Sequence, residues 1–360
     1  MLKVVFATGG SGGHIFPAIS VAQELEKQII DVEIIFIGSK VGIEKSILSD
    51  YDYDLITIDI RRLNRYITFK NLLLPYYITK SFMQAEKILK GIGCDMIIAF
   101  GGFVSSVVIL AAKSLGIPVF LQEQNSFPGL VTRLMAGFCT SVFLGNKEAK
   151  QFLSIPSKKL VFTGNPIRKF RKITKNSALN YFNLRNKKTI FVYGGSQGSS
   201  PINKFMSEIT CDLLSNDIQI IWQTGLKDYE FLQNKFEHES ILIEPFFKEI
   251  AYVYCASDLV ICRAGAISIA EVAYFALPSI IIPFPHAAAN HQLKNALQLK
   301  RNKAALLIEE KNLTANLLKE NIIDLIKNKN ERERISQNIK KLAVDNSAER
   351  IVKAIRNRLL

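Results

Sequence analysis

Glycine turns that precede helices are the segments of this chain best suited to chemistry. Two of them share an apolar run, a Gly-Gly-Ser-x-Gly turn and a helical pattern: VVFATGGSGGH at Val4–His14 and IFVYGGSQGS at Ile190–Ser199. A helix that begins after such a turn presents free backbone N–H groups and the positive end of its dipole, which together suit phosphate. Most single turns of this kind only serve packing, so their repetition in both halves is the informative signal.

A further turn of this kind lies within Val260–Ala296. The sequence predicts a buried strand ending at Cys262, a tight turn at Arg263–Gly265 and a helix beginning near Ala266. Glu271 lies about one and a half turns into that helix. A carboxylate there can accept hydrogen bonds from two neighbouring hydroxyls, as on a ribose. The segment therefore predicts a site for phosphate and ribose, with a glycine that only serves packing as the alternative.

Two basic side chains are candidates for chemistry beside the turns. His14 closes the first glycine turn at a helix start, where an imidazole can act as a general base or hold a phosphate. A purely local hydrogen bond is the alternative. Arg168 is either a phosphate ligand between domains or one cation of a basic run. His286 and His291 are five residues apart and would not share a helix face, so no metal site is predicted.

Two nucleotide-binding classes are excluded by their motifs. Neither glycine turn satisfies Gly-x-Gly-x-x-Gly, because Ile15 stands where the third glycine belongs, and no acidic residue follows the second predicted strand. The chain also lacks Gly-x4-Gly-Lys-Ser/Thr. Dinucleotide oxidoreductases and P-loop NTPases are therefore rejected. Five scattered cysteines without a Cys-x-x-Cys pair favour reduced thiols over a disulfide framework or a zinc site.

Short apolar strands alternate with helices through both halves of the chain. This pattern is typical of parallel sheets covered by helices on both faces. The 360 residues therefore predict an α/β protein of two domains, joined near Gly164–Pro166, whose glycine turns gather beyond the carboxyl ends of the strands around one cleft. The predicted strands are Lys3–Ala7, Glu33–Ile37, Asp54–Ile58, Asp95–Phe100, Pro118–Gln122, Ser141–Leu144, Leu160–Thr163, Thr189–Tyr193, Gln219–Gln223, Ile241–Glu244, Asp258–Cys262, Ser279–Pro283 and Ala304–Ile308.

Charge and apolar patterning suggest anionic partners. The net charge is +14, and Pro156–Lys188 carries ten Lys or Arg with no Asp or Glu, which suits nucleic acid, anionic lipid or a phosphorylated substrate. Arg61–Phe82 mixes apolar and basic residues, as an anionic membrane interface requires, although a helix packing on the sheet explains part of it. Without a signal peptide or an apolar run of ~20 residues, we expect a cytoplasmic protein or one on the cytoplasmic side of a membrane.

In their order and spacing, the motifs together resemble the MurG family, bacterial N-acetylglucosaminyltransferases that make lipid II for peptidoglycan. The resemblance implies a GT-B glycosyltransferase fold of two Rossmann-like domains: an acceptor and membrane domain at 1–166, a UDP-GlcNAc domain at 167–342, and a last helix at about 343–360 that packs back on the first domain. The matching segments are GGSGGHIFPA (Gly9–Ala18), GGFVSS (Gly101–Ser106), QEQN (Gln122–Asn125), GNPIR (Gly164–Arg168), GGSQGS (Gly194–Ser199), CRAGAISIAE (Cys262–Glu271) and HAAANHQLKNA (His286–Ala296).

The resemblance also implies a reaction and a set of site residues. GlcNAc would pass from UDP-GlcNAc to the C4 hydroxyl of MurNAc in undecaprenyl-pyrophosphoryl-MurNAc-pentapeptide, with inversion and without a cofactor or bound metal. His14 would be the base, or only an anchor for phosphate. The acceptor and its pyrophosphate would face Gly10, Ser11, Gly12, Gly13, His14, Gly101, Gly102 and Phe103. For the donor, the resemblance implies Phe247 at the uracil, Glu271 at the ribose and Gln292 at the sugar. The diphosphate would bind Ser196, Ala266, Ile267 and Ser268. Further implied donor residues are Ser11, Gly12, Gly13, Asn125 and Arg168.

Departures from the family pattern leave alternatives open. Ser11 stands where Thr is usual, Phe103 where Tyr is common, and Ala288–Asn290 lacks expected acidic residues. A UDP-GlcNAc 2-epimerase or a glycolipid synthase would use the same donor. A nucleic-acid-binding protein would instead depend on the net positive charge. The buried strands and the position of the basic cluster at a domain join argue against nucleic acid. Expected partners are UDP-GlcNAc, lipid I, the inner membrane surface that the enzyme binds peripherally, and a cell-wall synthesis complex.

Overall fold

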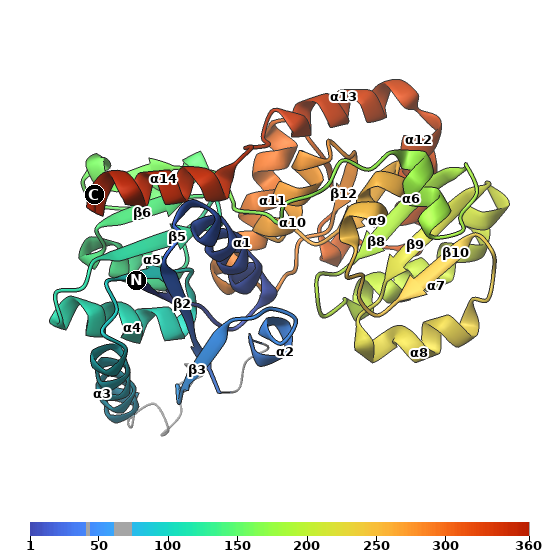
Figure 1. Cartoon of the computed structure of the whole chain (residues 1–360). Coiled ribbons are helices and arrows are strands. Elements are labelled where there is room, and N and C mark those ends of the chain that lie inside the picture. The colour runs from blue at the N-terminus through green and yellow to red at the C-terminus, as the bar shows by residue number, and fades with distance from the viewer. Residues whose placement is uncertain (41–43, 61–73, 360) are drawn as a thin grey trace. The chain divides into compact units, whose positions relative to one another are not determined.

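The computed structural model describes residues 1–40, 44–60 and 74–359. The chain forms two compact units, each built on one parallel sheet (Figure 1). Unit 1 comprises Met1–Arg168 and Val344–Leu360, and unit 2 comprises Lys169–Ala343. Within the described residues, no helix has the length and apolarity needed to cross a membrane.

Unit 1 is organised around a seven-stranded sheet in the order β3-β2-β1-β4-β5-β6-β7. Every neighbouring pair is parallel, and β1 pairs with β2 in the register Phe6↔Phe36 and with β4 in the register Phe6↔Ile98. The strands are β1 (Leu2–Ala7), β2 (Val32–Ser39), β3 (Asp54–Ile58), β4 (Met96–Ala99), β5 (Val119–Glu123), β6 (Ser141–Leu144) and β7 (Leu160–Phe162).

Helices cover both faces of this sheet, because successive strand residues point to opposite sides. Val4 and Phe6 pack with α1 and α14, whereas Val5 and Ala7 pack with α3 and α4. Figure 1 shows α14 lying alongside α1, although the two helices stand at opposite ends of the chain. The helices are α1 (Gly12–Gln28), α2 (Glu44–Leu48), α3 (Leu74–Ile92), α4 (Gly102–Ser114), α5 (Leu130–Met135) and α14 (Ser347–Leu359), with 3-10 turns at Ala136–Phe138, Lys147–Phe152 and Ser157–Lys159.

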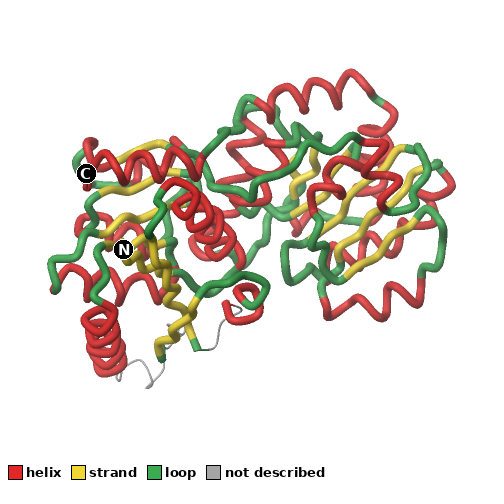
Figure 2. The backbone as a smooth tube through the Cα atoms, viewed as in Figure 1, coloured by secondary structure: helices red, strands yellow, loops and turns green. Residues whose placement is uncertain are grey.

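Unit 2 repeats the plan with a six-stranded sheet in the order β10-β9-β8-β11-β12-β13, again parallel throughout. The alternation of helix and strand is visible along the chain in Figure 2. The strands are β8 (Lys188–Tyr193), β9 (Ile218–Gln223), β10 (Ile241–Glu244), β11 (Leu259–Cys262), β12 (Ser279–Ile281) and β13 (Leu306–Leu307).

Two apolar clusters also flank the sheet of unit 2. One contains residues of α6, α9, α10 and α11, and the other contains residues of α7, α8 and α12. The helices are α6 (Lys175–Tyr181), α7 (Ser200–Ser215), α8 (Leu226–Lys235), α9 (Ile250–Ala256), α10 (Ala266–Tyr274), α11 (His291–Arg301), α12 (Ala315–Lys327) and α13 (Lys329–Lys340), with 3-10 turns at Ala288–Asn290 and Glu310–Asn312.

The strand order places the glycine turns at equivalent points of the two sheets. In unit 1 the chain runs outward through β2 and β3 and then continues on the other side of β1, at β4; in unit 2 β8 and β11 have the same relation. Ligands of such sheets bind beyond the carboxyl ends of the strands at this reversal. The turns after β1, β4, β8 and β11 all lie there. The fold class predicted from the sequence is confirmed.

Some predicted boundaries are wrong by a few residues. The first helix begins at Gly12, before the His14 that was expected to close the turn, because the carbonyl of Ser11 accepts the N–H groups of His14 and Ile15. The last strand contains only Leu306–Leu307 of the predicted Ala304–Ile308, because β13 is an edge strand that pairs with β12 at two positions.

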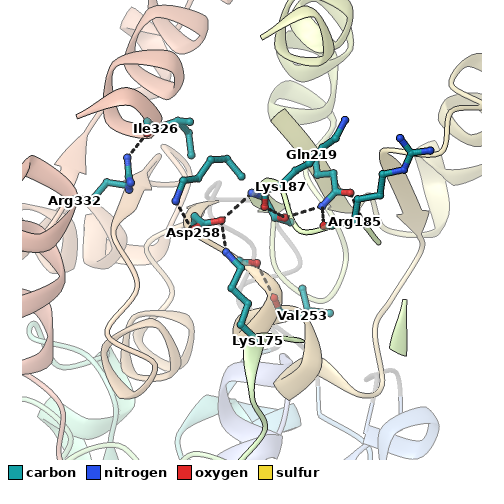
Figure 3. A network of polar contacts seen from close by, with 11 residues as sticks. Lys175, Arg185, Lys187, Gln219, Val253, Asp258, Ile326 and Arg332 are labelled. Carbon is teal, nitrogen blue, oxygen red and sulfur yellow. Dashed lines mark hydrogen bonds and ion pairs between the residues drawn. The ribbon is translucent and has the colours of Figure 1, made fainter. Parts of the chain in front are cut away.

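An ion-paired aspartate ties the amino ends of β8 and β11 in unit 2 (Figure 3). The Asp258 carboxylate accepts hydrogen bonds from Lys175 Nζ at 2.6 Å, Lys188 Nζ at 3.1 Å and the Thr189 N–H at 3.0 Å. Burial by itself would raise the pKa of Asp258, but the two lysines and the Thr189 N–H lower it below its ordinary value. In unit 1, Asp95 takes the same position before β4 and accepts the Lys3 N–H at 2.8 Å.

Candidate active site

The first glycine turn, after β1, is supported by a buried carboxylate. Glu44 is 0% exposed, and its Oε1 accepts the Gly10 N–H at 2.9 Å. A Cβ added to Gly9 would lie 2.7 Å from the same oxygen, so only glycine allows this approach. Glu44 Oε2 has no hydrogen-bond partner within the described residues. Ser11 and Gly13 are exposed beside the start of α1, and Gly12 is buried at its first position.

The turn after β4 packs directly against the first one. A Cβ on Gly102 would lie 2.6 Å from the Gly9 carbonyl oxygen, and a Cβ on Gly101 would lie 3.1 Å from Cε1 of His14. Both glycines have φ near +90°, at +92° and +80°, a region that L side chains rarely adopt. The His14 ring therefore lies against the second turn.

Asn125 is positioned by a neighbouring buried acid. Glu123 Oε1 accepts both the Asn125 N–H at 2.9 Å and its side-chain amide at 3.1 Å. Glu123 Oε2 accepts the Gly129 N–H at 3.0 Å and the Thr132 hydroxyl at 2.5 Å. One carboxylate thus holds the loop from β5 to α5, which carries Asn125.

Arg168 lies beside the start of α1 in unit 1. Its guanidinium is over the ring of Phe16, 4.9 Å from the centroid. Such stacking on an aromatic face helps to orient a guanidinium. Phe103 is half-buried in the first turn of α4.

The glycine turn of unit 2, at Gly194–Ser199, depends on close backbone contact. A Cβ on Gly198 would lie 1.9 Å from the Thr224 carbonyl oxygen, and one on Gly225 would lie 2.3 Å from the Gln197 carbonyl oxygen. The Gln223 side-chain amide donates to the Gly195 carbonyl at 3.0 Å. These contacts leave Ser196 exposed at the tip of the turn.

A buried arginine binds this turn from the protein interior. Arg263 is 5% exposed, donates to Ser199 Oγ at 2.7 Å and forms an ion pair with Glu310. It also donates to the carbonyls of Ile282 and Pro283 at 3.3 Å each. The guanidinium therefore joins the ends of three segments at the carboxyl edge of the sheet.

The start of α10 holds four of the predicted donor residues. Ala266, Ile267 and Ser268 occupy its first turn and are half-buried, and no acidic side chain lies in that turn. Glu271 follows on the next turn, 6% exposed, and its Oε2 accepts the Tyr254 hydroxyl at 2.9 Å. The helix end and the carboxylate thus lie on neighbouring turns of one helix.

Phe247 lies in the loop after β10, and Gln292 lies in the first turn of α11. The Phe247 N–H donates to Gln223 Oε1 at 3.0 Å, so its carbonyl is the backbone group left for a base. Gln292, in α11, accepts the Phe284 N–H at 2.9 Å through Oε1, which leaves its amide N–H groups as donors. Ala289 and Asn290, just before α11, have φ of 51° and 53°.

Sequence reasoning assigned no role to several residues that shape these loops. Each is buried and forms a hydrogen bond with one of the loops or with a predicted site residue. They are Glu44, Glu123, Gln223, Arg263 and Tyr254. Buried polar residues are rare enough to be a signal, but their partners lie up to 64 residues away in the chain, as for Arg263 and Ser199.

Two sequence predictions concern features beyond these loops. Of the segment predicted to meet a membrane, residues 61–73 lie outside the described residues; in the remainder, on α3, Tyr76 is 63% and Ile78 44% exposed. In the described part of the chain, no group of three or more His, Cys, Asp or Glu side chains has the arrangement of a metal site.

Comparison with known proteins connects both units to one family. Residues 4–144 match the glycosyltransferase family 28 N-terminal domain, and residues 189–351 match the family 28 C-terminal domain. Two relatives carry the name UDP-N-acetylglucosamine–N-acetylmuramyl-(pentapeptide) pyrophosphoryl-undecaprenol N-acetylglucosamine transferase. The one from Flavobacterium psychrophilum is 36% identical over 98% of this chain and 96% of its own length, and the one from Chlorobaculum parvum is 38% identical over 90% of each.

Solved structures show the same fold. Acinetobacter baumannii MurG has a TM-score of 0.76 at 26% identity, covering 99% of this chain and 100% of that one. The UDP-GlcNAc 2-epimerase from Neisseria meningitidis bound to UDP-GlcNAc has a TM-score of 0.67 at 16% identity, over 99% of this chain and 100% of that one. At that identity the second likeness concerns the fold alone.

Proposed function

We propose, on the premise that this chain belongs to the MurG family of glycosyltransferases, that it makes lipid II. It transfers GlcNAc from UDP-GlcNAc to the C4 hydroxyl of MurNAc in undecaprenyl-pyrophosphoryl-MurNAc-pentapeptide. The observation that carries the proposal is the extent of the match: relatives with this activity in their name agree with the chain over nearly its whole length.

Unit 2 is proposed to bind the donor. The first turn of α10, with its dipole and free N–H groups, suits the diphosphate, together with Ser196 on the adjacent glycine turn. Glu271, one turn further along α10, would accept hydrogen bonds from the ribose hydroxyls. The Phe247 carbonyl would bind the uracil, and the amide of Gln292 would bind the sugar hydroxyls. Asn125 and Arg168, from unit 1, are assigned to the same donor by family resemblance.

Unit 1 is proposed to bind the acceptor through its two packed glycine turns. His14, whose ring lies against Gly101, would take the proton from the C4 hydroxyl as that oxygen attacks C1 of GlcNAc. The bond from C1 to the UDP oxygen breaks, and the charge on UDP is stabilised by the α10 dipole and by Arg168. The pyrophosphate of the lipid would meet Gly10, Ser11, Gly12 and Gly13, with Gly102 and Phe103 beside the sugar.

The acceptor is a lipid, so the enzyme must work at a membrane. Three apolar side chains of α3, which also carries lysines, are exposed: Tyr76 at 63%, Ile78 at 44% and Met83 at 62%. We propose that Arg61–Phe82 binds the anionic surface of the inner membrane on its cytoplasmic side. Binding to anionic vesicles that survives Tyr76→Ser/Ile78→Ser would contradict this location.

The reaction is tested by transfer of labelled GlcNAc to a short-chain lipid I analogue in the presence of EDTA. Wild type is expected to turn over, and His14→Ala to lose at least about 100-fold in kcat, the range for removing a general base. The variant should bind UDP-GlcNAc as wild type does. Transfer that survives the substitution would remove His14 as the base. Absence of transfer in wild type, with UDP-GlcNAc bound and epimerised, would replace the proposed function by that of an epimerase.

A further inference from the structure

Two buried tyrosines form a line of hydroxyl groups that ends on Glu271. Tyr254, from α9, donates its hydroxyl to Glu271 Oε2 at 2.9 Å. The Tyr193 hydroxyl lies 2.9 Å from the Tyr254 oxygen, and the Ser268 side chain forms a hydrogen bond with Tyr193. Tyr193 is the last residue of β8, directly before the glycine turn. The line therefore connects the glycine turn, α9 and the start of α10.

Counting protons gives the line a direction. A phenol has one O–H, so Tyr254, which donates to the carboxylate, cannot also donate to Tyr193. The hydrogen bond between the two phenols must then run from Tyr193 to Tyr254. Burial raises the pKa of both phenols well above the ordinary tyrosine value, and the nearby Glu271 charge adds to the effect. Both hydroxyls consequently stay protonated and remain donors.

The line joins two parts of the proposed donor site. Ser268 and Glu271 are three residues apart on α10, so their side chains lie on the same face of the helix. One is assigned to the diphosphate and the other to the ribose. Tyr193 contacts Ser268 and Tyr254 contacts Glu271 from the protein interior. Tyr193 is 5% exposed and Tyr254 1%. Neither phenol itself is a candidate ligand group.

We propose that Tyr254 is a positioning residue for nucleotide recognition: it holds one oxygen of Glu271, so that the carboxylate is oriented toward the ribose hydroxyls before the donor arrives. Tyr193 orients the Tyr254 hydroxyl in turn. The inference rests on the proposed function, because it requires Glu271 to bind ribose. A merely structural pair of tyrosines would stabilise the fold without distinguishing nucleotides that differ only in the sugar.

The test compares the binding of UDP and 2′-deoxy-UDP by titration calorimetry on the full-length protein. Wild type is expected to prefer UDP by about 10-fold or more, the range for one hydrogen bond to a charged group. Glu271→Gln sets the reference for a weakened ribose contact. In Tyr254→Phe, which removes one oxygen atom, the preference should fall to within about two-fold of that reference. Affinity for 2′-deoxy-UDP should change much less than affinity for UDP.

Controls separate this inference from the function on which it rests. Tyr274→Phe, on the same helix as Glu271 but 40% exposed, should retain the wild-type preference. Tyr193→Phe leaves the bond from Tyr254 to Glu271 and should reduce the preference by a smaller factor, about two- to three-fold; it also serves if Tyr254→Phe does not fold, as judged by thermal unfolding.

The outcomes that overturn each claim differ. An unchanged preference in the folded tyrosine variants, or an equal loss of affinity for both nucleotides, would overturn the positioning role. An unchanged preference in Glu271→Gln would instead remove Glu271 from the ribose site and contradict that part of the proposed function.

Discussion

The two Gly-Gly-Ser-x-Gly turns of this protein, after β1 and β8, share a sequence pattern but are held by side chains of opposite charge. The turn of unit 1 is held by Glu44, whose carboxylate takes the Gly10 N–H and has no ion pair within the described residues. The turn of unit 2 is held by Arg263, which donates to Ser199 and is paired with Glu310. The same Gly-Gly-Ser-x-Gly motif thus sits on an acid in one unit and on a base in the other.

This difference shows that a glycine motif does not by itself define a ligand. A carboxylate that accepts one turn amide removes it from any phosphate and adds negative charge, whereas a guanidinium leaves the amides available and adds positive charge. The turn of unit 2 therefore suits a nucleoside diphosphate better than the turn of unit 1 does. The acceptor proposed for unit 1 also carries a pyrophosphate, which would therefore bind the N–H groups of Ser11, Gly12 and Gly13 and would not use the Gly10 N–H, which Glu44 occupies.

The largest effects are expected where the turns touch other backbone. Gly198→Ala and Gly102→Ala place a Cβ 1.9 and 2.6 Å from a carbonyl oxygen at positive φ, so each should destabilise its unit by about 2–5 kcal/mol. In Gly195→Ala, φ is +98° but no atom lies within 4 Å, which predicts a loss of only ~1–2 kcal/mol. Urea unfolding measures all three. Equal losses at Gly195 and Gly198 would show that backbone contact is not what requires glycine there.

Removing the base of unit 2 should have an effect of similar size. Arg263→Leu leaves Glu310 and two carbonyls without their partner, and breaking such a buried pair costs about 3–5 kcal/mol. The double variant with Glu310→Leu should recover part of this loss, which a double-mutant cycle of urea unfolding measures. Additive losses would show that the pair is not coupled. UDP affinity should fall in the single variant, since Ser199 is no longer held.

Removing the acid of unit 1 should have a smaller effect. Glu44→Ala removes the charged acceptor of the Gly10 N–H in a partly buried hydrogen bond, at a cost of about 1–3 kcal/mol, whereas Glu44→Gln retains an acceptor and should lose less than ~1 kcal/mol. Glu24→Ala is the matched control, because Glu24 is buried on α1 of the same unit and accepts from Gln28. Acceptor KM should rise in Glu44→Ala alone. A similar rise in Glu24→Ala would mean that general destabilisation causes it.

The smallest expected effect concerns how stability depends on pH at the amino ends of the strands, opposite the glycine turns. A carboxylate whose pKa is lowered by folding stabilises the protein above its unfolded pKa of about 4, and this contribution is lost as pH falls through the folded pKa. Asp258 is such a group. The free energy of unfolding should therefore fall less between about pH 5 and pH 2 in Asp258→Asn than in wild type. A fall in Asp258→Asn that is as steep as in wild type would contradict the role of Lys175 and Lys188.

The sequence predicted what depends on local pattern. The glycine turns, the start of α10 at Ala266 and the parallel strands all follow from spacing and apolar runs within a few residues. It could not predict which side chains support the turns. Glu44 acts on Gly10 across 34 residues, and Tyr254 reaches Glu271 from a different helix, so these contacts exist only once the strands are ordered in the sheet. Roles such as that of Gln292 came from family resemblance and stay predictions.

The return of the chain to unit 1 has a consequence for how the protein is made. Ile351, Val352 and Ile355 of α14 are buried in the same cluster as Ile15 and Ala18 of α1. On the ribosome, the first 168 residues emerge long before these last ones. The apolar face of α1 that α14 covers therefore stays uncovered while all of unit 2 is synthesised. A nascent chain of this kind needs protection during translation, and loss of the last turns of α14 would damage the half of the molecule that was made first.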